Sequence, residues 1–252
     1  MLIYGTAFSD NAINLIRENG LGLELLQYSD PAFLDNFDSK HAQITQYMQG
    51  ISGVSVHGAY LDTFYTSKDP LIREVSKKRF LQSVQAAAFH SIDRVVFHTA
   101  YRRYFDGHSK PALDNFLKKS IEFWQNFEEN IPDGMTVYLE NVEEENPEIL
   151  IKIIEGINSP KIQACFDVGH AFCSSSVDLI TWINVLGGTI GHVHIHDNDG
   201  SFDQHLPLGK GKIPILNTIQ EILKHVGDKI PFVLECDVPE SLECLRKEGI
   251  KI

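Results

Sequence analysis

The chain has 252 residues, of which 43% are hydrophobic and 22% charged, and its formal net charge is −12. This composition is typical of a globular protein and excludes the disordered and fibrous classes. The acidic excess argues against attraction to nucleic acid or to an anionic membrane by the overall electrostatic field. Because the four cysteines form no CxxC pair and no long apolar run or targeting pattern is visible, we expect a cytoplasmic protein without membrane attachment.

Short runs of β-branched and aromatic residues alternate with longer segments of helical periodicity. This order is typical of a parallel sheet built from βα units. The expected strands are residues 2–7, 23–29, 53–58, 94–100, 135–141, 162–168, 190–197 and 231–237. The expected helices are residues 11–20, 72–90, 111–129, 147–156, 177–186, 215–227 and 239–249. Since no linker or low-complexity tract divides the chain, we predict an α/β fold with a single (β/α)8 TIM barrel domain over residues 1–252.

Ionisable residues follow or end six of the expected strands. In a barrel of this kind the active site lies at the carboxyl ends of the strands, so these side chains meet in one small volume. Crowded carboxylates and imidazoles need a positive charge among them, and a divalent metal ion is the usual solution. Mixed histidine and carboxylate ligands suit zinc, manganese or magnesium. The strand ends and the loops beyond them offer nine candidate ligands: His57, His98, Glu140, Asp167, His170, His194, Asp203, His205 and Glu235.

The segment GHVHIHDND places a histidine at positions 192, 194 and 196. Because side chains alternate along a strand, all three share one face, which we expect to be the inward face. We expect His194 to be the metal ligand, with His192 deeper in the barrel and His196 nearer the rim. Either neighbour is suited to holding a ligand or a carboxylate in place, and His196 is also a candidate for substrate binding.

Three other residues are candidates for substrate binding. Tyr60 follows the strand that ends near His57 and is expected to form a wall of the pocket, with simple packing as the alternative. Arg102 is suited to gripping a phosphate with two hydrogen bonds. Lys210 lies in LGKGKIP after the seventh strand, where barrels often bind phosphate groups. For both basic residues a solvent-exposed loop is the alternative interpretation.

Several segments together resemble the xylose-isomerase-like TIM barrels, a superfamily that contains sugar isomerases and epimerases and also the endonuclease IV group, AP endonuclease family 2. They are VSVHGAYLD, VVFHTAY, YLENV, CFDVGHAF, HIHDNDGSFDQHLPLGKGKI and LECD, and they cover nearly the whole chain. The resemblance implies a metal ion held by Glu140, Asp167, His194 and Glu235. In the endonuclease branch it implies a three-zinc site with five further ligands, and a Tyr-Leu pair that enters DNA at Tyr60 and Leu61. Those five ligands match His57, His98, His170, Asp203 and His205.

The chain departs from the endonuclease pattern at three places. HDND, DQH and ENVEEENPE stand where that branch has Asn-Asp-Ser, Asp-Arg-His and an Ala-Gly-rich stretch, and the acidic loop would repel a phosphodiester backbone. HDNDGSFDQHLPLGKGKI instead resembles proteins described as sugar phosphate isomerases or epimerases. The relatives that epimerise ketoses at carbon 3 usually carry an arginine where this chain has Gly200.

We therefore predict a divalent-metal-dependent isomerase or epimerase of a small sugar or sugar phosphate. One to three ions are expected, zinc or manganese before others, with Glu140 and Glu235 as base and acid around an enediolate. The alternative is an endonuclease IV-like multi-zinc phosphodiesterase that acts on abasic DNA, and only this alternative requires nucleic acid as a partner. A binding barrel that keeps the metal without turnover is the third possibility.

Overall fold

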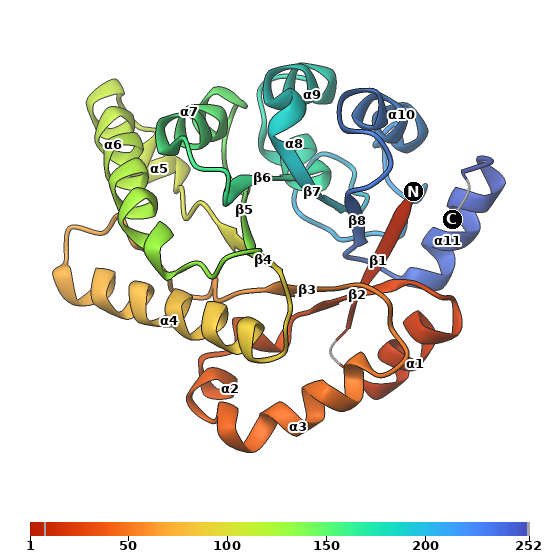
Figure 1. Ribbon diagram of the computed structural model, residues 1–252. Helices are drawn as coiled ribbons and strands as arrows, with labels where there is room; N and C mark the ends of the chain where they lie inside the picture. The colour runs from red at the N-terminus through yellow and green to blue at the C-terminus, as the bar shows by residue number, and fades with distance from the viewer. Residues whose placement is uncertain (8, 251–252) are drawn as a thin grey trace.

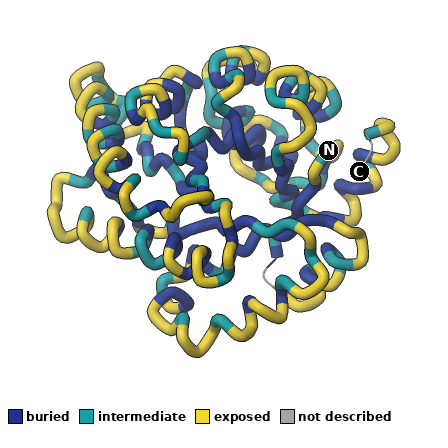
Figure 2. The backbone as a smooth tube through the Cα atoms, viewed as in Figure 1, coloured by how far each residue is buried: buried dark blue, intermediate teal, exposed yellow. Residues whose placement is uncertain are grey.

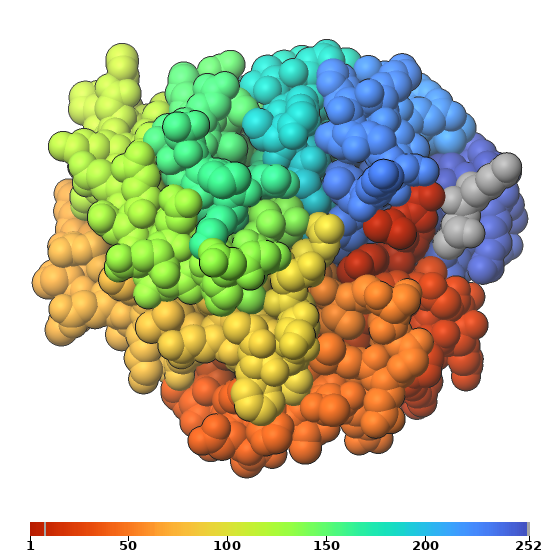
Figure 3. All heavy atoms as spheres, viewed as in Figure 1, coloured from red at the N-terminus to blue at the C-terminus, as the bar shows by residue number. Residues whose placement is uncertain are grey.

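The computed structural model describes residues 1–7 and 9–250, and its centre is a closed barrel of parallel strands that follow one another in sequence order (Figure 1). The strands are β1 (Leu2–Ala7), β2 (Gly22–Leu25), β3 (Val54–His57), β4 (Arg94–His98), β5 (Thr136–Glu140), β6 (Ile162–Asp167), β7 (Ile190–Ile195) and β8 (Pro231–Leu234). β8 pairs with β1 and closes the ring, so the first and last strands lie side by side, and Figure 3 shows red atoms of the N-terminal segment next to blue atoms from late in the chain. The predicted fold class is confirmed.

Helices surround the barrel on its outer face (Figure 1). They are α1 (Asp10–Glu18), α2 (Pro31–Asp35), α3 (Phe37–Met48), α4 (Pro70–Phe89), α5 (Arg103–Asp106), α6 (Lys110–Phe127), α7 (Glu148–Ile157), α8 (Val168–Ser174), α9 (Leu179–Leu186), α10 (Ile215–Val226) and α11 (Val238–Lys247), with short 3-10 turns η1 (Gln27–Ser29), η2 (Glu128–Asn130) and η3 (Gly187–Thr189). All seven expected helices are present with small shifts at their ends. The sequence pattern did not indicate α2, α3, α5 or α8, of which α2, α5 and α8 have seven residues or fewer.

Most strands end earlier than the apolar runs suggested. The largest difference is in β2, which stops at Leu25, and the expected extension to residue 29 forms η1 instead. β7 ends at Ile195 and β8 at Leu234, so His196 and Glu235 lie one residue beyond their strands. The Glu235 N–H still donates to the Ile195 carbonyl oxygen at 3.2 Å, so this residue is held at the end of the ladder beside the open end of the barrel.

The apolar core lies mainly between the strands and the helices, and Figure 2 shows the strands as buried. Phe80 on α4, Trp124 on α6 and Trp182 on α9 are fully buried in this layer. Inside the barrel a smaller apolar group is formed by Val96, Tyr138 and Cys165. The interior also contains fully buried polar side chains, among them Glu24, Ser55, His192 and His194. Polar side chains therefore make up much of the barrel interior near the carboxyl ends of the strands.

Two buried aspartates shape the backbone around the site. Asp167 ends β6 and caps α8, because its Oδ1 accepts a hydrogen bond from the backbone N–H of His170 at 2.6 Å. Asp197 accepts the backbone N–H groups of Gly209, Gly211 and Ile213 at 2.8–3.1 Å and closes the loop that carries Asp203 and His205. A Cβ at Gly211 would lie 2.3 Å from the carbonyl oxygen of Asn198, so this loop requires glycine there.

None of the helices in the described part of the chain combines the length and the apolar character needed to cross a membrane.

Candidate functional site

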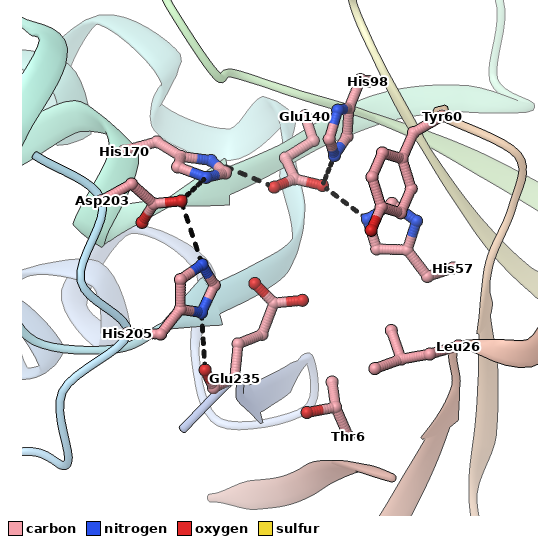
Figure 4. A pocket seen from close by; sticks show the side chains of 10 residues that line it. All are labelled: Thr6, Leu26, His57, Tyr60, His98, Glu140, His170, Asp203, His205 and Glu235. Carbon is pink, nitrogen blue, oxygen red and sulfur yellow. Dashed lines mark hydrogen bonds and ion pairs between the residues drawn. The ribbon is translucent and has the colours of Figure 1, made fainter. Parts of the chain in front are cut away.

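A cavity of about 250 Å³ opens at the carboxyl end of the barrel (Figure 4). Its walls come from strand ends and from the loops that follow them. Seven of the nine candidate ligands line it, and the other two, Asp167 and His194, are fully buried and contact the carboxylates and imidazoles of the wall. The lining residues are Thr6, Leu26, His57, Tyr60, His98, Glu140, His170, Asp203, His205 and Glu235.

Glu140, Asp167 and Glu235 surround a single nitrogen of His194. The Nδ1 atom of His194 lies 3.3 Å from Glu140 Oε1, 3.4 Å from Glu235 Oε1 and 4.0 Å from Asp167 Oδ2. Within the described chain, Nδ1 of His194, both oxygens of Glu140 and Oδ2 of Asp167 have no hydrogen-bond partner. Three carboxylates around one imidazole nitrogen are the kind of donor set that divalent cations bind, so these residues fit a metal ion.

A second group lies on the other side of Glu140. His57 Nε2 is 3.2 Å and His98 Nε2 is 3.5 Å from Glu140 Oε2, and all three donor atoms lie close enough to hold one ion. Each of the three residues ends its strand, and these strands are neighbours in the barrel. Figure 4 shows both imidazoles directed at the same carboxylate. Glu140 therefore lies between the two groups and is suited to bridging two ions.

A third group contains His170, His196, Asp203 and His205. Asp203 contacts all three imidazoles, at 3.3 Å from His170 Nε2, 3.3 Å from His196 Nε2 and 3.1 Å from His205 Nε2. The four donor atoms lie within 4.8 Å of one another. The structure thus brings together all nine candidate ligands in three adjoining groups, and it places His196 among them rather than on the lining of the cavity.

The electrostatics of the two candidate catalytic glutamates differ. Burial raises the pKa of Glu140, but His194 and His98 outweigh this effect and hold that pKa well below its usual range. Burial also raises the pKa of Glu235, and the attraction of His194 offsets only part of the rise. Burial lowers the pKa of His98 to about 3, so its imidazole is neutral and keeps a lone pair for a ligand bond.

The substrate-binding candidates occupy different places. Tyr60 lines the cavity and stacks on His98, with ring centroids 4.6 Å apart. Arg102 lines a neighbouring cavity of about 350 Å³, where its guanidinium carbon lies 4.8 Å from the Phe64 ring and its Nε lies 3.3 Å from Asp106. Tyr60 and His98 belong to the walls of both cavities.

Lys210 lies in an exposed loop and is not one of the described residues that line the cavity at the carboxyl end of the barrel. Its Nζ pairs with Glu240 at 3.3 Å, and its side chain is 60% exposed. The backbone N–H groups of the neighbouring Gly209 and Gly211 already donate to Asp197. The backbone N–H groups that the sequence suggested for binding a phosphate therefore bind the carboxylate of Asp197.

The acidic loop after β5 presents less free charge than its sequence suggests. Glu145 accepts hydrogen bonds from Arg103 Nε at 3.0 Å and from the Tyr101 hydroxyl at 2.7 Å. Glu143 accepts the backbone N–H of Arg103 at 2.9 Å, and Glu144 is buried. The expected repulsion of a phosphodiester by this loop is weakened accordingly.

Glu24 is the residue of the site that sequence reasoning missed. It lies on β2, is fully buried, and contacts His192, His194 and Ser55 beneath the cavity. The only sequence signal is an acidic residue within the apolar run GLGLELL, where a buried strand should have none.

A family model described as a xylose isomerase-like TIM barrel matches residues 13–251. The chain belongs to this family. The uncharacterized proteins MJ1311 and MJ1614 of Methanocaldococcus jannaschii are 26% and 31% identical to it over 69% and 68% of its length. The matches span 61% and 66% of those two relatives, less than two thirds of each.

Solved structures share the fold over nearly the whole chain. The TTHB071 protein from Thermus thermophilus, in a crystal soaked with ZnCl2, is 24% identical with a TM-score of 0.76, and the match covers 98% of this chain and 97% of that one. A D-tagatose 3-epimerase-like protein is 22% identical with a TM-score of 0.76 over 99% and 98% of the two chains. At these identities the similarity establishes the barrel, and the chemistry depends on the site.

Proposed function

We propose that the protein is a divalent-metal-dependent isomerase or epimerase of a small sugar or sugar phosphate. The main support is the placement of Glu140 and Glu235, which approach the same His194 nitrogen from β5 and β8. Figure 4 shows their carboxylates directed into the space between the two strand ends. The names of related structures, a D-tagatose 3-epimerase-like protein and a zinc-soaked barrel, agree with a sugar substrate and a zinc ion.

A metal ion held by Glu140, Asp167, His194 and Glu235 would polarise a substrate carbonyl and make the neighbouring C–H more acidic. The carboxylates of Glu140 and Glu235 then accept that proton on one face of the substrate and return one on the other. Tyr60 covers one side of the cavity and, stacked on His98, limits the access of water. The small cavity favours a compact substrate, because about 250 Å³ must hold both the metal and the reacting carbons.

A second candidate function is an endonuclease IV-like phosphodiesterase with several zinc ions. It is favoured by the second and third groups of possible ligands, which a one-metal isomerase does not need. The net charge of −12 opposes it, because a nuclease must attract the DNA backbone.

Metal content and substrate choice separate the two functions. We expect protein purified without added metal to hold about one tightly bound zinc or manganese ion per chain, and to convert a member of a ketose and aldose panel. Glu235→Gln is expected to abolish this conversion. About three zinc ions per chain, together with cleavage of an abasic duplex that competing ketose does not inhibit, would instead establish the phosphodiesterase.

A further inference from the structure

The two nitrogens of the His194 ring face different surroundings. Nδ1 faces Glu140, Asp167 and Glu235 at the cavity, as described above. Nε2 lies on the opposite side of the ring, 2.9 Å from Glu24 Oε1. This approach is a close ion-pair contact. Neither Nε2 nor Oε1 makes a hydrogen bond within residues 1–7 and 9–250, so each is the nearest polar atom that the other can use.

Glu24 is itself held in place from two directions. Its Oε2 accepts a hydrogen bond from the Ser55 hydroxyl at 2.8 Å, and Ser55 is its register partner on the adjacent strand β3. The same oxygen lies 2.9 Å from Nε2 of His192, two residues before His194 on β7. Glu24, His192 and His194 are all fully buried. The carboxylate therefore cannot swing away from the His194 ring without losing both of these partners.

A metal-binding imidazole needs a lone pair on one nitrogen and carries its hydrogen on the other. The second nitrogen usually donates to a carboxylate or a carbonyl, which fixes the tautomer and the ring orientation and makes the ligand more basic. The atoms around His194 match this arrangement, with a carboxylate oxygen beside Nε2 and the candidate metal ligands at Nδ1. A buried carboxylate without such partners would be strongly unfavourable, because its charge would lose its hydration without gaining hydrogen bonds or an opposite charge.

We infer that Glu24 is a positioning residue, which holds His194 with its hydrogen on Nε2 and its lone pair on Nδ1, ready for the metal ion. This inference rests on the proposed metal site and adds a role that involves no contact between Glu24 and the substrate. It also explains the row of histidines on β7. His194 binds the ion, and His192 helps to hold the carboxylate that orients it.

The test is the affinity of chelator-treated protein for Zn²⁺, measured by competition with a chromophoric chelator. We expect Glu24→Leu to weaken the tightest Zn²⁺ site by about 100-fold and Glu24→Gln, which keeps an acceptor oxygen but loses the charge, by about 10-fold. The matched control is Glu144→Gln, another buried glutamate, which contacts Thr99 and should leave the Zn²⁺ affinity unchanged. Wild-type affinity in Glu24→Leu would overturn the inference, because a purely structural role changes only the stability of the metal-free fold.

A second measurement protects the test against misfolding. Nitrogen-detected NMR of the histidine rings in the Zn²⁺-loaded protein should show the His194 hydrogen on Nε2 and the metal on Nδ1, and Glu24→Gln should shift the Nε2 resonance. Ser55→Ala keeps the carboxylate but removes one of its two holding contacts, so a loss of Zn²⁺ affinity below about tenfold is expected there. An unchanged affinity in Ser55→Ala combined with an Nδ1-protonated His194 would reject the inference. If the wild-type protein binds no Zn²⁺ at all, the proposed metal-dependent function fails. If the wild type binds Zn²⁺ and Glu24→Leu binds it equally tightly, only the inference about Glu24 fails.

Discussion

The end of strand β5 and the loop that follows it each bury one glutamate, and the two have opposite properties. Glu140 and Glu144 are both 1% exposed. Around Glu140 lie four imidazoles within 3.5 Å, and its pKa is held well below the usual range against the effect of burial. Glu144 contacts the hydroxyl of Thr99 and accepts the backbone N–H of Val142, and burial raises its pKa to about 7.

The difference shows that the kind of partner, and not the depth of burial, decides the state of a carboxyl group in this barrel. Imidazoles keep Glu140 charged and available to a cation, whereas the hydroxyl and the backbone amide beside Glu144 offset only part of the effect of burial and leave its pKa at about 7. Two residues of one type, four positions apart in the chain, thus serve the site and the scaffold respectively.

The largest effect is expected for Glu140→Gln. The amide can neither bridge two groups of imidazoles as an anion nor accept a proton, so kcat/KM for the proposed sugar substrate should fall by about 10²- to 10⁴-fold. Metal content per chain, measured on the same sample, should fall as well. Glu144→Gln is the control from the adjoining loop and should retain activity. Full activity in Glu140→Gln would remove this residue from the proposed chemistry.

Glu144→Gln should change the pH dependence of stability instead. The folded-state pKa of about 7 lies above the ordinary value of 4.5, so the fold favours the protonated acid. The stability from this group is fully present below pH 4.5 and is lost as the pH rises through about 7. The neutral amide avoids the loss, so in mildly alkaline buffer the variant should be more stable than the wild type by roughly 3 kcal/mol.

Urea unfolding of both proteins at about pH 5 and about pH 8 measures this effect. The gain should be present in the alkaline buffer and small in the acidic one. A gain of equal size in both buffers would indicate a packing effect unrelated to ionisation.

The smallest effect is expected at an exposed ion pair. Lys210 and Glu240 form a salt bridge on the surface, and such pairs contribute at most about 1 kcal/mol. Lys210→Ala should not change the stability by more than this amount, and the KM of the substrate should stay the same. A large rise in KM for a phosphorylated sugar, but not for its unphosphorylated form, would instead support the phosphate-binding role that the sequence suggested for Lys210.

The sequence alone determined the barrel, the order of its strands and the residues at their carboxyl ends. It could do so because alternating apolar runs and helical segments specify βα units, and because parallel strands in a closed ring bring their ends to one place. Strand ends such as His57, His98, Glu140 and Asp167 are therefore readable from local pattern. Short helices such as α2 and α8 are not, since so few residues carry no clear period.

Only the tertiary structure decided which side chains become partners. Glu24 contacts His192, which lies 168 residues away in the sequence, and Glu143 and Glu145 bind Arg103, which lies about 40 residues away. Neither pairing leaves a local sequence pattern. Closure of the ring sets these distances, because strands β2 and β7 face the same interior without being neighbours in the sheet. A buried carboxylate takes its charge state from such neighbours, and chain folding alone supplies them.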